Sequence, residues 1–284
     1  MSRQHVIDPP GGPSPRWSPS PLLYASAAVH LGAAAAVFAR PHAWPWALGA
    51  LAANHLGLAA AGLWPRSRLL GSNWTRLPEQ DGAEARVAIT IDDGPDPDVT
   101  PPVLARLTEH RAQATFFCVG VRVERYPDLA REIVNRGHRI ENHSHRHRHD
   151  FSLMGPGGMK TEISRAQDAI WRVTGTSPNF FRAPAGLRNP FLDPVPTHLQ
   201  LRLASWTRRG FDTVSADADA VYRRLTNPLR DGDILLLHDG NAALTRGAKP
   251  VILEVLPRLL DALALKQLRS VTLRSALPPS SAVS

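Results

Sequence analysis

The chain has 284 residues, a formal net charge of +8 and one cysteine. This length suits one sizeable domain with an appendage, and a single cysteine excludes an internal disulfide framework. An excess of basic over acidic residues is typical of proteins that bind nucleic acid or anionic membranes. Here the arginines are scattered and no helix-turn-helix or RNA-binding aromatic motif is present. We therefore expect no nucleic-acid partner.

The N-terminal part of the chain predicts a membrane anchor. Residues 1–20 are rich in proline and glycine and are expected to be disordered. Two apolar stretches follow at 22–39 and 43–64, each about long enough to cross a bilayer as a helix of roughly 17–25 residues. The second stretch has tryptophans at its ends, as in the aromatic belts of membrane proteins. We predict two transmembrane helices within residues 21–66.

Two alternatives remain for this region. A buried soluble hairpin would show the same apolar pattern, and the first stretch could be a cleaved signal peptide. A signal peptide fits poorly, because its charged region would be long and proline-rich and a second apolar stretch follows. The connection at 40–42 is short, so the two helices are expected to be antiparallel neighbours.

The arginines around the hairpin predict its orientation. Arg3 and Arg16 precede it, three arginines follow it, and only Arg40 lies at the turn. The positive-inside rule then places both ends in the cytoplasm, with the chain as a two-pass protein of a bacterial inner membrane. If only one stretch spans, the following domain lies on the opposite side.

After a linker at 67–83, residues 84–277 have the pattern of an α/β domain, and a disordered tail is expected at 278–284. Short β-forming runs alternate here with helical patterns. Repeated strand–helix units predict a parallel sheet or barrel, in which catalytic groups gather at the carboxyl ends of the strands. The predicted strands are 87–91, 114–120, 138–142, 179–183, 201–206, 233–238 and 270–273. The predicted helices are 99–111, 127–137, 159–175, 218–229 and 249–264.

Polar side chains follow several of these strands directly. Asp92 and Asp93 come after the first strand, a histidine tract (ENHSHRHRHD) ends the third, Arg182 lies in the fourth, and His238 ends the sixth. Taken alone, the pair Asp92 and Asp93 is also typical of a turn, and a histidine tract can be a solvated loop. Together, however, these groups supply the ligands, base, acid and orienting cation that a metal-assisted hydrolase requires.

Two imidazoles and one carboxylate suit zinc or another first-row divalent ion, with an open position for water. The tract holds four histidines at alternate positions. Its spacing leaves two candidate pairs open, His143 with His147 and His145 with His149.

Five motifs in order resemble the NodB-homology polysaccharide deacetylases, the carbohydrate esterase family 4 group. They are TIDDGP at 90–95, NHSHRH at 142–147, RAPAG at 182–186, a degenerate motif from Trp206 to Asp212, and LLHD at 236–239. The resemblance covers roughly residues 86–275. It implies an irregular (β/α)7-8 barrel of the glycoside hydrolase/deacetylase type. It also implies hydrolysis of an N-acyl group, most simply N-acetyl, from an amino sugar of a polysaccharide or glycoconjugate.

The resemblance further implies a role for each matching residue. Asp93, His143 and His147 would bind one divalent metal ion, for which zinc is the first expectation. Asp92 would be the general base that deprotonates the attacking water, held ionised by Arg182. His238 would be the general acid that protonates the departing amine.

Three other positions complete the implied site. Asp212 would pair with His238 and favour its charged form. The backbone N–H of Ala185 would help to bind the oxyanion, and Leu236 would line the pocket for the acyl methyl group. The sequence departs from the family at Ala185, where tyrosine is usual, and at Thr213, where tryptophan is usual. Both departures affect the expected choice of substrate more than the reaction.

Other assignments remain open. The chain could hydrolyse another non-peptide C–N bond, such as a sugar formamide or a cyclic amide. It could also be a non-catalytic, membrane-anchored glycan-binding protein. His145 and His149 are expected either to face solvent or to lie around the metal ligands. Arg208 and Arg209 are expected to form a solvated pair, or else to contact an anionic group of the substrate. Because a cytoplasmic domain does not meet an extracellular polymer, a lipid-linked glycan at the membrane surface is an expected substrate.

Overall fold

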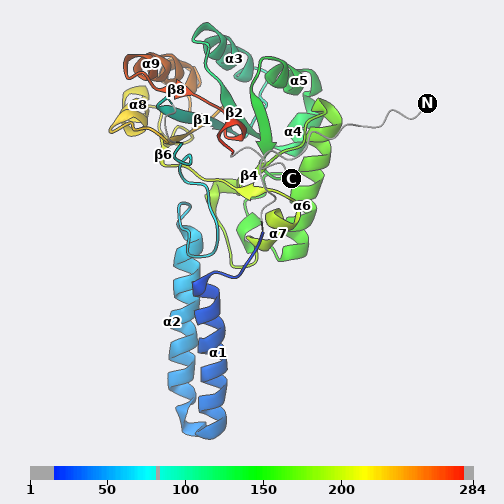
Figure 1. Cartoon of the computed structure of the whole chain (residues 1–284), viewed down its shortest axis with the longest axis vertical. Helices are drawn as coiled ribbons and strands as arrows, with labels where there is room; N and C mark the ends of the chain where they lie inside the picture. Colours follow the sequence, from blue (N-terminus) through cyan, green and yellow to red (C-terminus); the bar gives the residue numbers. More distant parts are fainter. Residues whose placement is uncertain (1–15, 81–83, 278–284) are drawn as a thin grey trace, which may run out of the picture.

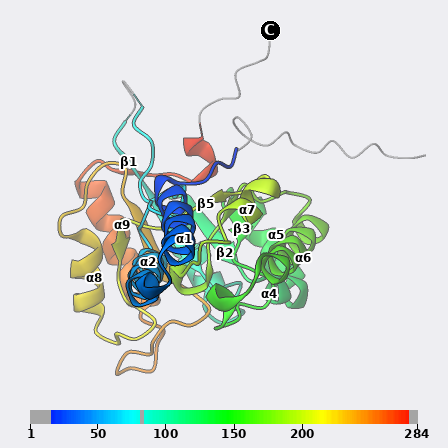
Figure 2. The same ribbon diagram turned by 90° about the horizontal axis from the view of Figure 1, so that it is seen from below.

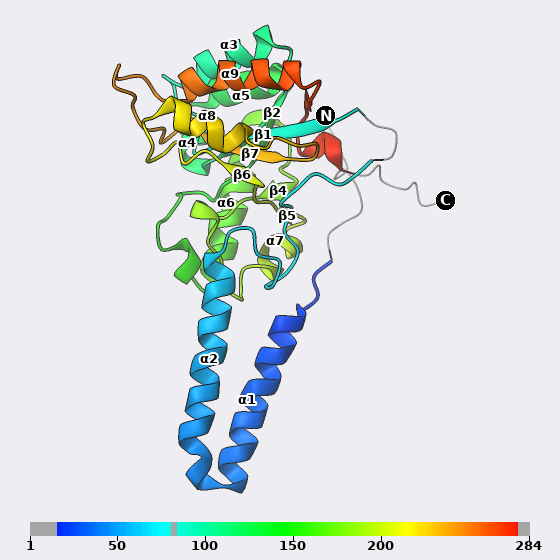
Figure 3. The ribbon, with the colours of Figure 1, turned by 90° about the vertical axis from the view of Figure 1, so that its left-hand side faces the viewer.

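The computed structural model describes residues 16–80 and 84–277, which form a helical hairpin and an α/β domain (Figure 1). The predicted disordered tail at 278–284 lies outside the described residues, as do residues 1–15 of the predicted disordered N-terminus. The hairpin projects from one end of the domain as a rod of two adjacent helices (Figures 1 and 3).

The hairpin consists of α1 (Pro21–Ala39), the short 3-10 helix η1 (Pro41–Ala43) and α2 (Trp44–Leu63). Ser20 caps α1, because its Oγ accepts a hydrogen bond from the Leu23 N–H at 3.3 Å. Both helices are long and apolar enough to cross a membrane, by length and composition. Little of either is buried, and Phe38 is 92% exposed. A buried soluble hairpin therefore does not describe them.

Polar side chains join the two helices of the hairpin. Asn54 Nδ2 donates to Ser26 Oγ at 3.0 Å, and the rings of His30 and His55 meet edge to face at 5.2 Å between centroids. Hydrogen bonds of this kind hold helices together where the surroundings are apolar. They fix how α1 and α2 face each other.

The domain is built on one parallel sheet in the order β5-β4-β3-β2-β1-β7-β6, with β8 beside β1. The described strands leave the sheet open between β5 and β6, so it is a half-barrel. The predicted parallel (β/α) fold is confirmed. The strands are β1 (Arg86–Asp92), β2 (Ala114–Cys118), β3 (Arg139–Asn142), β4 (Phe180–Phe181), β5 (Arg202–Leu203), β6 (Arg208–Arg209), β7 (Ile234–His238) and β8 (Arg269–Ser270).

Helices surround the sheet, as the view from the hairpin end shows (Figure 2). Each predicted helix is present, within a few residues at its ends. The two short helices α4 and α7 were not predicted. The helices are α3 (Thr100–Glu109), α4 (Gly120–Arg125), α5 (Pro127–Asn135), α6 (Pro156–Thr174), α7 (Pro194–His198), α8 (Ala218–Thr226) and α9 (Ile252–Leu265).

The alternation of side chains along β1 and β7 determines which groups face the barrel interior. Val87, Ile89 and Ile91 pack in the main core together with residues of α3 and α9, while Ala88 belongs to the smaller interior cluster. On β7, Leu235 and Leu237 join the main core, and Leu236 joins the interior cluster. Because the period is two, Asp92 and His238 fall on the interior side at the carboxyl ends of their strands.

The end of α2 docks against the loop that follows β4. The Arg188 N–H donates to the Gly62 carbonyl at 3.0 Å, and Arg188 Nη2 donates to the Ser67 carbonyl at 2.5 Å. A Cβ on Gly62 would overlap the Arg188 carbonyl, so only glycine permits this approach. The hairpin is therefore attached at the carboxyl edge of the sheet.

Candidate active site

A pocket opens at the carboxyl edge of the sheet, where the sequence predicted the functional groups to gather. Asp92, Asp93, His143, His147 and His238 line it together. Other lining residues come from the end of β6 and from the loops after β4, β5 and β6: Ala185, Gly186, Trp206, Arg209 and Thr213. Leu236, His149 and Asn241 complete the lining.

Asp93, His143 and His147 form a cluster with the donor set of a metal site. One ligand atom from each lies within 4.8 Å of the others. Asp93 Oδ1 is 3.3 Å from His143 Nε2 and 3.1 Å from His147 Nε2. This oxygen is buried and accepts no hydrogen bond of good geometry from the described residues. Two imidazoles and an uncommitted carboxylate oxygen fit a divalent cation such as zinc.

Neighbouring groups orient the side chains of this cluster. His143 Nδ1 donates to the Arg182 carbonyl at 2.8 Å, which leaves Nε2 free to coordinate. The His147 N–H donates to Ser144 Oγ at 3.0 Å. Ser144 and His147 both have positive φ (63° and 50°), so the chain turns sharply between the two histidines. This turn brings both rings to the same carboxylate.

The carboxylate of Asp93 is held in its charged form. Burial raises its pKa, but contact with His143 and the charges of nearby histidines outweigh burial and keep the pKa far below its usual range. Asn241 Nδ2 donates to Asp93 Oδ2 at 2.9 Å, and so directs Oδ1 toward the histidines. Asn241 was not identified from the sequence, although it lies three residues after His238 at the same strand end.

Asp92 is bound by a buried arginine. Arg182 Nη1 donates to Asp92 Oδ1 at 2.6 Å and to Thr90 Oγ1 at 2.8 Å, and Nη2 donates to the Ser205 carbonyl at 2.7 Å. The guanidinium lies over the Phe117 ring, 4.0 Å from its centroid. The second oxygen, Asp92 Oδ2, lies 3.7 Å from His143 Nε2 and so faces the metal-ligand cluster. The predicted pair of Asp92 and Arg182 is present.

His238 is bound by a buried aspartate. Its Nδ1 donates to Asp212 Oδ1 at 2.8 Å, and its backbone N–H donates to Asp212 Oδ2 at 2.7 Å. Burial alone would lower the pKa of His238, but the hydrogen bond and the charge of Asp212 raise it to about 8. The ring is therefore mostly protonated at neutral pH.

The remaining predicted residues also lie at the pocket. Ala185 lies in η3 (Pro184–Gly186) with a positive φ of 54°. Leu236 is buried on β7, next to the pocket. Trp206, which begins the degenerate fourth motif, and Thr213, which directly follows it, line the same space.

The two other histidines of the tract lie differently from the expected ligands. His149 lines the pocket from an exposed position. His145 is buried, which excludes solvent exposure, one of the two expected positions, and leaves a position near the ligands. The sharp turn at Ser144 breaks the strand alternation, and the His145 ring packs against Gly120 instead.

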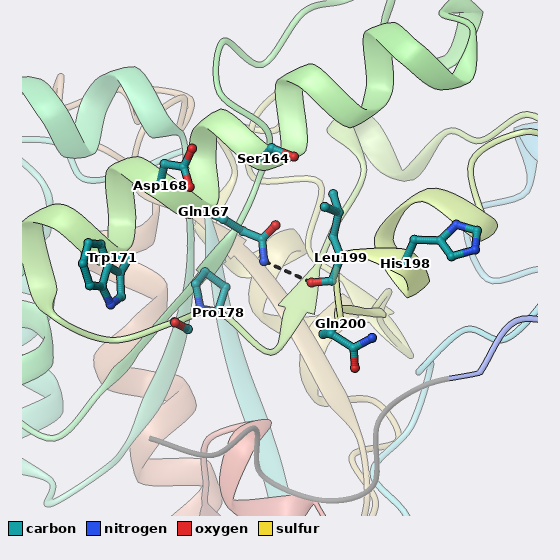
Figure 4. Close-up of a pocket in the computed structure, with 9 residues that line it drawn as sticks. Ser164, Gln167, Asp168, Trp171, Pro178, His198, Leu199 and Gln200 are labelled. Atoms are coloured by element: carbon teal, nitrogen blue, oxygen red, sulfur yellow. Dashed lines mark hydrogen bonds between the residues drawn. The ribbon is translucent and has the colours of Figure 1, made fainter. Parts of the chain in front are cut away.

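A second hollow lies between α6 and α7 and shares no residue with the candidate site (Figure 4). Gln167 Nε2 donates there to the Leu199 carbonyl at 3.2 Å. Its lining includes Asp168 and His198 but no second carboxylate or histidine. It therefore lacks the set of groups that the first pocket brings together.

Comparisons with known proteins agree with this geometry. Residues 79–203 match the model of the family described as polysaccharide deacetylase. A peptidoglycan-N-acetylglucosamine deacetylase of Bacillus cereus is 34% identical over 159 residues, which are 55% of this chain and 74% of that protein. A chitooligosaccharide deacetylase of Bradyrhizobium is 35% identical over 155 residues, 54% of this chain and 70% of that protein.

Another relative and a solved structure are also similar to this chain. A second peptidoglycan-N-acetylglucosamine deacetylase of Bacillus cereus is 29% identical over 178 residues, which are 62% of this chain but only 64% of that protein. Among solved structures, a family 4 carbohydrate esterase from Streptomyces lividans in complex with acetate superposes with a TM-score of 0.60. It is 33% identical, and the match covers 66% of this chain and 93% of that one.

Proposed function

The chain belongs to the polysaccharide deacetylase family of hydrolases that cleave non-peptide C–N bonds, and we propose that it removes an N-acetyl group from an amino sugar of a glycan. One observation carries the proposal. Asp92 with Arg182, His238 with Asp212, and the cluster of Asp93, His143 and His147 all face one pocket.

The proposed reaction uses the two pairs in opposite ways. Asp92, which is paired with Arg182, takes a proton from the attacking water. His238, held as an imidazolium by Asp212, donates a proton to the departing amine. An amide leaving group requires this proton, because an unprotonated amine is expelled very poorly. Two groups with different partners can hold these opposite protonation states at the same pH.

Asp93, His143 and His147 would hold a divalent metal ion, with zinc as the proposed one. When bound, such an ion polarises the acyl carbonyl and acidifies water. The backbone of Ala185 would help to stabilise the oxyanion, and Leu236 would contact the acyl methyl group.

We further propose that the hairpin anchors the chain as a two-pass protein of a bacterial inner membrane. The exposed apolar surfaces of α1 and α2 support this, since soluble proteins rarely expose contiguous apolar surface of such extent. By the positive-inside rule, the flanking arginines favour a cytoplasmic position for the domain. A lipid-linked glycan is then the substrate that such a domain can reach.

The proposal is tested by acetate release from N-acetylglucosamine oligomers and glycolipids, together with metal analysis of the purified full-length chain. We expect acetate release from the wild type and one divalent ion per chain. Asp92→Asn should retain the ion and lose activity by roughly 10²- to 10⁴-fold. Full activity in this variant would exclude Asp92 as the base. A reporter fused to the C-terminus that is active only in the periplasm would overturn the cytoplasmic placement.

A further inference from the structure

A groove lined by arginines continues from the catalytic pocket toward the end of α2. We call it the arginine groove. It shares Ala185, Trp206 and Arg209 with the catalytic pocket. Its other wall comes from the end of the hairpin and its continuation, Leu63 to Arg66. A molecule in this groove can therefore reach both the catalytic groups and the end of α2.

The groove is strongly positive. Four arginines line it and no aspartate or glutamate does. Arg208 has an acidic partner, since its Nε lies 3.2 Å from Asp233 Oδ2, although Asp233 also pairs with Arg76 at 2.7 Å. Arg66, Arg209 and Arg224 form no ion pair with any residue in the described part of the chain. Three arginines without acidic partners around one hollow create a field that favours an anion.

Arg209 is positioned in advance by aromatic rings. Its guanidinium lies 5.5 Å from the Trp206 ring centroid and 4.9 Å from that of Phe211, while Arg224 lies 5.7 Å from the same Phe211 ring. Arg209 Nε is buried and has no hydrogen-bond partner among the described residues. A buried donor without a partner costs free energy, which an anionic ligand would recover. Stacked arginines are well suited to bidentate binding of phosphate.

The place of the groove indicates the kind of ligand. Leu63 ends α2 and Trp64 follows it, 56% exposed, at the level where a spanning helix leaves the bilayer. Along the groove, the apolar end of α2 comes first, the arginines follow, and the catalytic pocket comes last. A molecule that matches this order has a lipid chain, an anionic group and a sugar.

We propose that the arginine groove binds the phosphate or diphosphate of a lipid-linked amino sugar. The sugar enters the catalytic pocket, and the lipid chain runs beside the end of α2 into the bilayer. This inference rests on the proposed deacetylation only for the chemistry at the sugar. It goes further by assigning Arg209, Arg224 and Arg66 to recognition of the anionic linkage.

The test compares two synthetic compounds on the full-length chain in nanodiscs. One has N-acetylglucosamine joined to a geranyl chain through a diphosphate, and the other has the same sugar and chain joined by a glycosidic bond. The measured quantity is the ratio of kcat/KM for the charged over the neutral compound. Arg209→Gln and Arg224→Gln should each lower this ratio about tenfold, the equivalent of about 1.4 kcal/mol.

Arg106→Gln is the matched control. Arg106 lies on α3, at the end of the domain away from the hairpin (Figure 1). It has an acidic partner, Glu109, at 2.7 Å. This variant should leave the ratio unchanged. If Arg209→Gln lowers kcat/KM equally for both compounds, Arg209 shapes the pocket and does not bind the phosphate. This result would overturn the inference.

A binding measurement separates this inference from the deacetylation itself. Asp92→Asn is titrated with the charged compound by calorimetry, with and without Arg209→Gln. If the wild type releases no acetate but Arg209→Gln weakens binding about tenfold, the proposed activity fails and the groove assignment stands. Binding that does not depend on Arg209 overturns the assignment. Displacement of the compound by phosphatidylglycerol in the nanodisc would assign the groove to lipid headgroups and also overturn it.

Discussion

Asp92 and His238 are register partners on the neighbouring parallel strands β1 and β7. Each is bound by a buried residue of opposite charge from elsewhere in the chain, Asp92 by Arg182 and His238 by Asp212. The sheet therefore places one carboxylate and one imidazole side by side, with opposite electrostatic partners. This arrangement is what a reaction with a base step and an acid step requires.

The raised pKa of His238 predicts the pH dependence of activity. The proposed acid is active when protonated, so activity should fall as the pH rises through about 8. Asp212→Asn removes the charge that raises this pKa, and burial then lowers it. The alkaline limb of the kcat profile should therefore move to lower pH in the variant. The shift is measured by comparing the two profiles at saturating metal; an unmoved limb would exclude His238 as the titrating acid.

The metal-ligand assignment predicts different outcomes for two histidines of one tract. His147→Ala removes a proposed ligand, whose Nε2 lies 3.1 Å from Asp93 Oδ1, and bound metal should be lost. His149→Ala removes an exposed ring of the pocket wall and should largely keep the metal. Metal content of the purified variants decides this, and equal loss in both would contradict the assignment.

Much of the sheet and its carboxyl edge could be predicted, because β1 and β7 are nearly continuous apolar runs, as is typical of buried parallel strands. Long apolar runs that end in polar residues indicated both the strands and the position of Asp92 and His238. β6, the two residues Arg208 and Arg209, could not be predicted. It has no apolar pattern and forms only because it lies beside Leu235 and Leu236 of β7.

The histidine tract has a backbone conformation that its sequence does not predict. Its regular spacing would align all four rings on one face of a strand, but β3 ends at Asn142. The chain then turns at Ser144 and again at His147, where φ is positive. No side chain in the tract requires this turn as glycine would, so the burial of His145 could not be deduced.

The pair of Arg182 and Asp92 predicts a strong effect on stability. Arg182→Met would leave the buried carboxylate of Asp92 without its partner, and removing one member of a buried pair costs about 3–5 kcal/mol. Urea unfolding of the full-length chain in detergent measures this loss. Adding Asp92→Asn to the variant should restore part of the stability, since the unpaired charge is then removed. A double variant no more stable than Arg182→Met would show that lost packing causes the effect.

The hydrogen bond from the His147 N–H to Ser144 Oγ predicts an effect on metal affinity from a residue that is not a ligand. Ser144→Ala removes the acceptor that holds the turn, so the His147 ring is no longer fixed opposite Asp93. Loss of such an orienting partner typically weakens metal binding roughly 10- to 100-fold. Competition with a metal chelator measures the change, and Ser164→Ala on α6 is the control, since Ser164 lines the second hollow. Because both variants remove one hydroxyl, a selective loss in Ser144→Ala would reflect the turn itself.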